Sequence, residues 1–120
     1  MTALLLPYPP SINHYYGRKR GGNLFVQQAG VVFRMATAVA ARKICPQGMK
    51  SPRMTGRIKV RIDLFPPDRR RRDLDNVLKC LLDALMYAGC YEDDSQIDDL
   101  RVVRCGVVKD GAVSVVMEGL

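Results

Sequence analysis

The residues with the clearest chemical potential lie in one short stretch, from Asp68 to Lys79. Four consecutive arginines, Arg69–Arg72, are followed directly by the carboxylates of Asp73 and Asp75. Guanidinium groups bind phosphate oxygens through paired hydrogen bonds. Carboxylate oxygens are ligands that Mg²⁺ prefers, and the ion keeps several waters when it binds them. This stretch therefore combines a candidate phosphate clamp with a candidate metal site.

A second acidic cluster follows at Glu92–Asp94, with Asp98 and Asp99 close behind it. Cleavage of a phosphodiester bond needs both an acidic cluster and a basic cluster. One metal ion activates the attacking water, another stabilises the leaving oxygen, and nearby cations balance the charge of the phosphate. Without a metal, so many carboxylates would repel an anionic substrate. The acids are therefore more consistent with metal ligands than with a pair of acid and base catalysts.

Each of these features also has a purely structural interpretation. The arginine run and the second acidic cluster can both be solvated loops. Asp73 and Asp75 can cap a helix, because Asp is favoured at the N-cap and complements the helix dipole. Asp75, Lys79 and Asp83 recur every four residues. On a helix they form either a surface row of ion pairs or a row of site residues that faces a cleft.

Other catalytic schemes have little support. His14 is the only histidine, so a Ser-His-Asp or HNH arrangement would depend on it alone, and we interpret it as a loop residue. No glycine cluster has the spacing of a P-loop or a dinucleotide-binding fingerprint. The cysteines at positions 45, 80, 90 and 105 form no C-x-x-C pair. This spacing excludes a zinc ribbon and indicates reduced, mostly buried thiols.

Charge is distributed unevenly along the chain. Residues 1–60 contain ten Lys and Arg and no Asp or Glu, whereas residues 61–120 contain nine basic and twelve acidic residues. The net charge of +7 and the basic first half favour a polyanionic partner. No apolar run has the length of a membrane span, and the N-terminus lacks the basic region of a secretory signal. We therefore expect a cytoplasmic protein that binds nucleic acid and not a membrane.

The length of 120 residues predicts one domain. Apolar periodicity and turn residues predict these elements in chain order: a strand over Thr2–Leu6, a polar loop over Ser11–Gly22, a short strand over Leu24–Val26, a helix over Gln28–Ile44, a loop over Cys45–Thr55, a strand over Gly56–Phe65, a helix over Asp73–Ala88, an acidic loop over Tyr91–Gln96, and strands over Leu100–Val108 and Ala112–Met117.

Periodicity also indicates which faces these elements bury. The strand over Gly56–Phe65 alternates apolar residues with a mostly basic outer face. In the first helix the apolar residues at helical spacing are Val32, Met35, Ala36, Val39 and Ala40, and in the second they are Leu74, Val77, Leu78, Leu81, Leu82 and Leu85. Gly89 suits the end of the second helix, and Asp110-Gly111 predicts a hairpin. The fold class is therefore α+β, a small mixed sheet with two main helices packed on one face.

At these residues the sequence resembles the RusA family of Holliday-junction resolvases. Its central motif matches Pro67–Asn76 together with Lys79. Further matches are Pro9–Tyr16, Asp83-Ala84-Leu85, Ala88-Gly89, Asp93-Asp94 and Arg101-Val102-Val103. The resemblance covers essentially the whole chain; it is most specific over residues 67–103 and weak over about residues 23–55.

The resemblance implies a RusA-like endodeoxyribonuclease domain over residues 1–120, from a bacterium or a prophage. It implies a homodimeric, Mg²⁺-dependent enzyme of DNA recombination and repair that nicks four-way DNA junctions symmetrically, without a small-molecule cofactor. By position, the metal ligands are Asp73, Asp75 and Asp94, with Asp93 as the alternative third ligand, and Lys79 is the catalytic lysine. The implied DNA contacts are Arg18, Lys19, Arg20, Arg69, Arg70, Arg71, Arg72 and Asn76.

The spacing of the acidic clusters predicts a site shared between two subunits. A helix over residues 73–88 spans about 24 Å, and the stretch from Ala88 to Asp94 reaches at most about 20 Å. One chain would have to fold straight back to bring Asp94 to Asp73, whereas a two-fold partner supplies it at modest cost. Two other functions stay open, a non-catalytic DNA-binding protein on the same fold and a general RNA or flap nuclease.

Overall fold

Alternating apolar residues place strand β4 (Ile58–Phe65) at the centre of the molecule. In the computed structural model, which describes residues 1–45, 48–49 and 51–120, its four inward side chains are at most 2% exposed. They are Ile58, Val60, Ile62 and Leu64. The side chains between them point to the other face, as the two-residue period of a strand requires. The predicted strand is confirmed, although it begins at Ile58 and not at Gly56.

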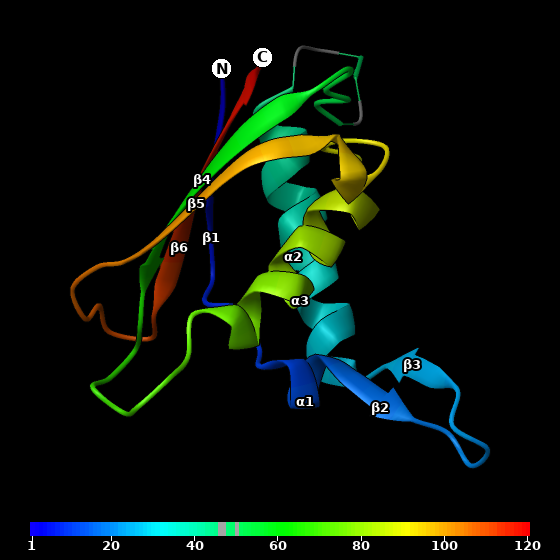
Figure 1. Ribbon diagram of the computed structural model, residues 1–120, viewed down its shortest axis with the longest axis vertical. Helices are drawn as coiled ribbons and strands as arrows, with labels where there is room; N and C mark the ends of the chain where they lie inside the picture. Colours follow the sequence, from blue (N-terminus) through cyan, green and yellow to red (C-terminus); the bar gives the residue numbers. More distant parts are fainter. Residues whose placement is uncertain (46–47, 50) are drawn as a thin grey trace.

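A mixed four-stranded sheet forms around β4 (Figure 1). β4 pairs in parallel with β5 (Ile97–Arg104) and antiparallel with β6 (Ala112–Gly119). β6 also pairs antiparallel with β1 (Thr2–Leu6), so the strand order is β1-β6-β4-β5. The predicted α+β fold with a small mixed sheet is confirmed.

The hairpin predicted at Asp110-Gly111 is wrong, although the tight turn itself is present. Asp110 and Gly111 have φ values of 66° and 73°, and the amide of Gly111 donates to the carbonyl of Val108 over 2.8 Å. The strands on either side of this turn do not pair with each other, because β4 lies between β5 and β6. Turn geometry depends on local residues, whereas the choice of a pairing strand depends on which strand is apolar enough to be central.

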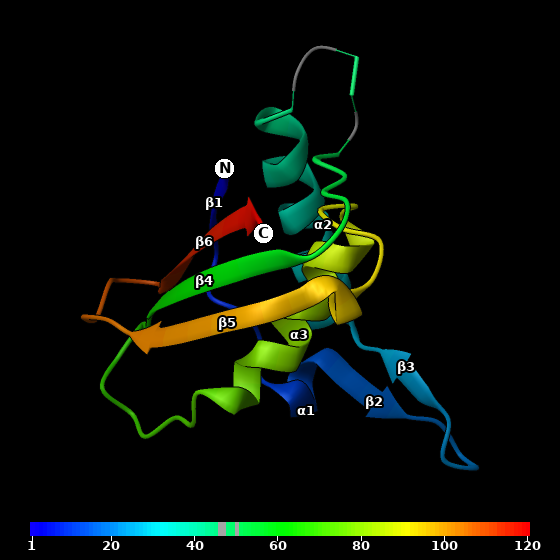
Figure 2. The ribbon, with the colours of Figure 1, turned by 45° about the horizontal axis from the view of Figure 1, so that its top comes forward.

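Two helices, α2 (Gln28–Lys43) and α3 (Asp75–Tyr87), cover one face of the sheet (Figures 1 and 2). α3 contributes these buried residues: Val77, Cys80, Leu81, Ala84 and Leu85. Leu74, predicted in the core stripe, is 37% exposed because it precedes the first residue of the helix. The helix ends as predicted, with Gly89 at a φ of 77° directly after it.

α2 buries a different face from the one marked by its apolar periodicity. The buried residues are Gly30, Phe33, Thr37 and Ala41. Val32, Met35 and Val39 of the predicted stripe are 58%, 60% and 54% exposed. The cause is close packing against Tyr15, because a Cβ atom on Gly30 would lie 2.8 Å from the Tyr15 carbonyl oxygen. The glycine therefore selects which face of α2 packs inward.

The polar loop predicted over Ser11–Gly22 is wrong in part, because it contains regular structure. A short helix α1 (Ile12–Tyr15) leads into β2 (Tyr16–Arg18), which pairs antiparallel with β3 (Leu24–Val26). Burial of Tyr15, which is fully inaccessible, anchors this segment to the core. β2 and β3 form an arm that extends away from the helices (Figure 2).

After α3 the chain forms a short 3₁₀ helix, η1 (Asp94–Gln96), before β5. The loop predicted over Cys45–Thr55 includes Pro46, Gln47 and Lys50, which lie outside the described residues. The four cysteines are free thiols, of which Cys80 and Cys90 are buried. Among the described residues, none of the helices has the length and apolar character that crossing a membrane requires.

Candidate active site and nucleic-acid interface

The start of α3 carries the two carboxylates that lead the predicted site. Asp75 is the first residue of the helix, Asp73 lies two residues earlier, and both are exposed. Leu74 occupies the N-cap, and in this described part of the chain no side-chain cap hydrogen bond is formed. The structure therefore does not show side-chain capping by these aspartates, although Asp75 lies in the first turn, where an acid complements the helix dipole. Both carboxylates are accessible to a hydrated cation.

Asn76 and His14 complete the predicted polar residues near this end of α3. Asn76 is half-buried, and its backbone amide donates to the carbonyl of Asp73 over 3.2 Å. His14 lies in α1 and not in a loop, and its Nδ1 shares a hydrogen bond of 2.6 Å with the hydroxyl of Ser11. The His14 ring is therefore engaged in a local contact, whereas the contact of Asn76 involves only its backbone.

Lys79 follows Asp75 by one helical turn and is exposed. Its Nζ lies 5.4 Å from the centroid of the Tyr16 ring, within the range of a cation–π contact. The ion pairs among the described residues include none between Lys79 and either of its acidic neighbours on α3, Asp75 and Asp83. The structure thus does not show the surface row of ion pairs, and the Lys79 ammonium is accessible to a phosphate.

Asp83 is bound instead by groups from α1 and α2. Arg34 Nη2 lies 2.7 Å from Asp83 Oδ2, and the Tyr15 hydroxyl donates to the same oxygen. Arg34 Nε also donates to the Tyr15 hydroxyl over 2.7 Å. Burial and the hydrogen bond to Asp83 raise the pKa of Tyr15. Sequence reasoning missed this cluster, because its members are far apart in the chain.

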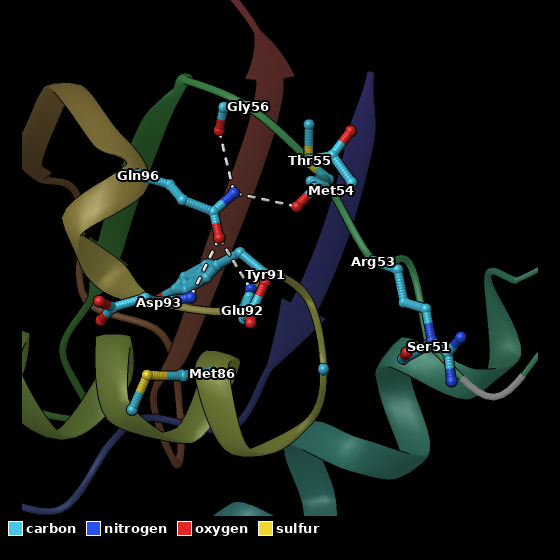
Figure 3. Close-up of a pocket in the computed structure, with 11 residues that line it drawn as sticks. Ser51, Arg53, Met54, Thr55, Gly56, Met86, Tyr91, Glu92, Asp93 and Gln96 are labelled. Carbon is cyan, nitrogen blue, oxygen red and sulfur yellow. Dashed lines mark hydrogen bonds between the residues drawn. The ribbon is translucent and has the colours of Figure 1, made fainter.

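The second acidic cluster lies in a turn that Gln96 holds in place (Figure 3). Gln96 Oε1 accepts hydrogen bonds from the amides of Glu92 and Asp93, over 2.9 and 3.0 Å. Its Nε2 donates to the carbonyls of Met54 and Gly56, over 3.1 and 2.9 Å. The turn borders a cavity of about 890 Å³ whose lining includes Arg53, Met86 and Tyr91.

The two aspartates of this turn have different environments. Asp93 accepts a hydrogen bond from the Ser95 hydroxyl over 2.8 Å, which lowers the pKa of Asp93. Partial burial, followed by the neighbouring Asp93, raises the pKa of Asp94. Asp93 is thus tied to its own turn through Ser95. Asp94 in turn is hydrogen-bonded to Asp93, so the two carboxylates are coupled within one turn.

The chain does turn back after α3, but only over the last turns of the helix. The buried Tyr91, two residues after Gly89, donates its hydroxyl to the carbonyl of Leu82 over 2.6 Å. This contact brings the acidic turn beside α3, and the charge of Asp83 helps to raise the pKa of Asp94. The acidic turn therefore lies beside the second half of the helix.

The two acidic clusters remain apart within one chain. Asp83 follows Asp75 by eight residues, which is about 12 Å along the helix axis. Over residues 1–45, 48–49 and 51–120, no group of three His, Cys, Asp or Glu side chains lies close enough to hold a metal. Asp73, Asp75 and Asp94 therefore do not form a three-ligand site in the chain as described.

Three arginines of the run are exposed, and the fourth, Arg72, is bound by neighbouring residues. Arg72 Nη1 lies 2.5 Å from Asp68 Oδ1, and its guanidinium carbon lies 5.9 Å from the centroid of Tyr8. The hydrogen bond from Arg72 holds the pKa of Asp68 at about 2, below its usual value. Arg69–Arg71 are exposed. Three of the four arginines in this run are therefore accessible to DNA, while Arg72 shapes the loop.

Arg104, at the end of β5, is a further basic residue that sequence reasoning missed. Its guanidinium donates to the carbonyl of Arg72. A cavity of about 550 Å³ is lined by Arg69–Arg72 and Arg104, together with Cys105 and Gly106. The sheet register explains why Arg104 lies beside the arginine run. Arg104 pairs with Leu64 near the end of β4, and β4 leads into that run. The charge of this cavity suits an anion such as a backbone phosphate.

The third basic segment is the tip of the β2–β3 arm. Arg18, Lys19 and Arg20 are exposed there. The tip turns at Gly21 and Gly22, which have φ values of 96° and 93°, a region that glycine adopts without strain. At one end of the molecule, the first turn of α3 lies between this arm and the arginine loop (Figures 1 and 2). The two accessible carboxylates are therefore flanked by basic segments.

The outer face of β4, by contrast, is not a free basic surface. Its cations pair with neighbouring acids: Arg57 with Asp98, Lys59 with Glu118 and Arg61 with Asp63. Exposed pairs of this kind add little stability, but they neutralise the face. The predicted basic outer face is thus a mixed one, whereas the segments Arg69–Arg71 and Arg18–Arg20 that flank the start of α3 are exposed.

Replacing both Arg70 and Arg71 with Ala is expected to flatten the salt dependence of DNA binding by up to about two units of slope in log K against log salt, because each phosphate contact contributes about 0.9. The matched control is Arg42→Ala/Lys43→Ala, which removes two exposed charges at the far end of α2. Anisotropy titrations of labelled DNA at several salt concentrations measure both slopes. Equal slopes for the two variants would place the arginine run outside the interface.

Comparison with known proteins identifies the family of the chain. The family model described as endodeoxyribonuclease RusA matches residues 7–118. A protein of Enterobacteria phage HK97 named crossover junction endodeoxyribonuclease rusA is 43% identical over 111 residues, which are 92% of this chain and 88% of that protein. The crossover junction endodeoxyribonuclease RusA of Escherichia coli K12 is 41% identical over 109 residues, 91% of this chain and 87% of that protein.

A relative of the same name from Enterobacteria phage 82 is 40% identical over 109 residues, 90% of this chain and 86% of that protein. The matches span both the N-terminal arm and the α3 region, so they include every segment placed around the candidate site. The chain therefore belongs to the endodeoxyribonuclease RusA family.

Proposed function

We propose that the protein is a Mg²⁺-dependent, structure-specific endodeoxyribonuclease that resolves four-way (Holliday) DNA junctions by paired symmetric nicks. The observation that carries the proposal is the position of Asp73 and Asp75, two accessible carboxylates at the start of α3. This end of α3 lies between the β2–β3 arm and the loop before the helix (Figure 1). The relatives, which are named crossover junction endodeoxyribonucleases, suggest the substrate class. Residues 1–120 would act as one nuclease domain, of bacterial or prophage origin.

The donor set at the start of α3 fits a Mg²⁺ ion. Its members are hard carboxylate oxygens, and both Asp73 and Asp75 are exposed. Mg²⁺ is usually held by one or two carboxylates, waters and substrate phosphates, and not by an all-protein cage. Two carboxylates in one chain are therefore sufficient to begin a site, with Asp94 as the third ligand. When bound, the ion supplies an activated water and stabilises the leaving oxygen.

The remaining residues bind and orient the DNA. The Lys79 ammonium, one turn from Asp75, donates hydrogen bonds to a non-bridging oxygen and offsets the negative charge that builds up on the phosphate. Arg69–Arg71 and Arg104 hold a flanking phosphate in the cavity of about 550 Å³. The arm with Arg18–Arg20 contacts a second duplex arm of the junction. Each role needs accessible cations, and these side chains are exposed.

We also infer a homodimer in which Asp94 of one subunit completes the site of the other. Within one chain the acidic turn lies beside the second half of α3, away from Asp75. A closed two-fold dimer makes an isologous interface and hence two equivalent sites. Two sites related by a two-fold axis match a junction whose opposing strands must both be cut.

The test is cleavage of a synthetic immobile four-way junction, with a linear duplex of the same sequence as the control. Each strand is labelled in turn and incubated with the protein, with and without Mg²⁺. We expect paired nicks at symmetric positions in opposing strands, only in the junction and only with the metal. Tight junction binding without cleavage would identify a non-catalytic binding protein. Equal cleavage of duplex, flap or RNA would identify a general nuclease.

A further inference from the structure

A cluster of charged and aromatic side chains lies beside Lys79 and has no role in the chemistry described above. Arg34 of α2 pairs with Asp83 of α3, and the two side chains are 23% and 20% exposed. The guanidinium carbon of Arg34 lies 4.8 Å from the centroid of Tyr87 and 5.6 Å from that of Tyr15. The cluster therefore connects α1, α2 and α3, one helical turn along α3 from the candidate catalytic lysine.

Asp83 lies one helical turn after Lys79, and side chains four residues apart on a helix are neighbours. These two residues would therefore attract each other if Asp83 had no other cation. In the structure Arg34 and the Tyr15 hydroxyl bind the same oxygen of Asp83. The Lys79 ammonium lies over the ring of Tyr16 instead. Among the described residues, the Asp83 carboxylate therefore pairs with Arg34 and not with Lys79.

We propose that Arg34 is a positioning residue for cleavage: by binding Asp83, it keeps the Lys79 ammonium free of a carboxylate on its own helix and available to the scissile phosphate. This inference rests on the proposed function. It concerns a residue of α2 that is neither a candidate metal ligand nor a candidate DNA contact.

The positive charge of Arg34 is needed at this position to balance the carboxylate of Asp83. Tyr15 is neutral and donates one hydrogen bond, so it cannot balance a half-buried carboxylate by itself. Without Arg34, the charge of Asp83 would be uncompensated, and such a group attracts the nearest mobile cation. That cation is Lys79, because its long side chain starts one turn away on the same helix.

The first experiment is a double-mutant cycle of single-turnover junction cleavage at saturating protein. Arg34→Met is expected to lower the rate roughly three- to tenfold with little change in junction affinity, because a partly screened ion pair with Asp83 competes for Lys79. Asp83→Asn, which removes the competing carboxylate, is expected to keep most of the activity. Arg34→Met/Asp83→Asn should then cleave like Asp83→Asn alone.

A merely structural role for Arg34 gives the opposite pattern. If Arg34 only tied α2 to α3, the double variant would be as slow as Arg34→Met or slower, and this result would overturn the proposal. Arg34→Lys keeps the charge and is expected to retain activity; a loss as large as in Arg34→Met would also overturn it. Arg34→Gln replaces Arg34→Met in the cycle if circular dichroism shows that the methionine variant is unfolded.

The second experiment does not depend on cleavage. The free protein is acetylated with sulfosuccinimidyl acetate, and labelling of Lys79 is followed by mass spectrometry, with the exposed Lys109 as internal control. Lys79 should react more slowly in Arg34→Met and recover in the double variant, since pairing with Asp83 stabilises its protonated form. Unchanged labelling across all variants would overturn the inference. This pattern in a protein that fails to cut junctions would disprove the proposed function alone.

Discussion

Replacing Asp75 with asparagine is expected to abolish junction cleavage while junction binding is kept or tightened. The substitution is nearly isosteric, but it removes an anionic metal ligand and a charge that repels DNA. A bound metal supplies several kcal/mol of transition-state stabilisation, so we expect the single-turnover rate to fall on the order of 10³-fold or more. Cleavage of a labelled four-way junction and anisotropy titrations with the same junction measure the two effects.

Asp110→Asn is the matched control for this variant. Asp110 is an exposed acid in the turn before β6, and its φ of 66° suits asparagine. It removes the same charge from a residue that is not a candidate metal ligand, so its cleavage rate should stay close to that of the unmodified protein. Unchanged turnover in Asp75→Asn would exclude Asp75 as a metal ligand. Loss of folded structure in Asp75→Asn, seen by circular dichroism, would instead show that its role is structural.

Mixing Asp75→Asn subunits with Asp94→Asn subunits is expected to restore cleavage that neither variant shows alone. If each site takes Asp75 from one subunit and Asp94 from the other, a heterodimer has one site that lacks both ligands and one that is intact. The intact site should nick one strand of the junction. The measurement is nicking of a labelled junction after subunit exchange, for which differently tagged subunits allow heterodimers to be purified.

The alternative outcome of the mixing experiment is equally informative. If purified heterodimers do not nick, each site belongs to one chain, and the acidic turn must move along α3 when metal and DNA bind. A mixture of Asp73→Asn with Asp75→Asn subunits is the control, because both residues lie at the start of the same helix. It should remain inactive in either case, since every heterodimer site would lack one ligand.

Sequence patterns predicted the features that depend on neighbouring residues in the chain. β4 was predictable because strict alternation of Ile58, Val60, Ile62 and Leu64 with polar residues is compatible with one buried face. The turn at Asp110-Gly111 was predictable from its residues, but its hairpin was not, because a more apolar strand occupies the place between its two sides. Strand pairing is a property of the whole sheet.

The candidate site shows the same division. The accessibility of Asp73 and Asp75 follows from their position at the start of a helix with polar neighbours, which the sequence displays. The pairing of Arg34 with Asp83 does not, since it depends on how α2 and α3 pack. The glycine at position 30 decides that packing by steric contact with Tyr15, whereas periodicity alone favours the larger apolar residues of α2.

The place of β6 in the sheet has a consequence for synthesis. Thr2 pairs with Met117, and Ile58 pairs with Gly119. Both β1 and β4 therefore pair with a strand that is synthesised after them. A nascent chain can form its helices early, but its sheet cannot close until β6 has left the exit tunnel. A chain that stops before β6 would therefore leave β1 and β4 without the strand that joins them, so the sheet would not form.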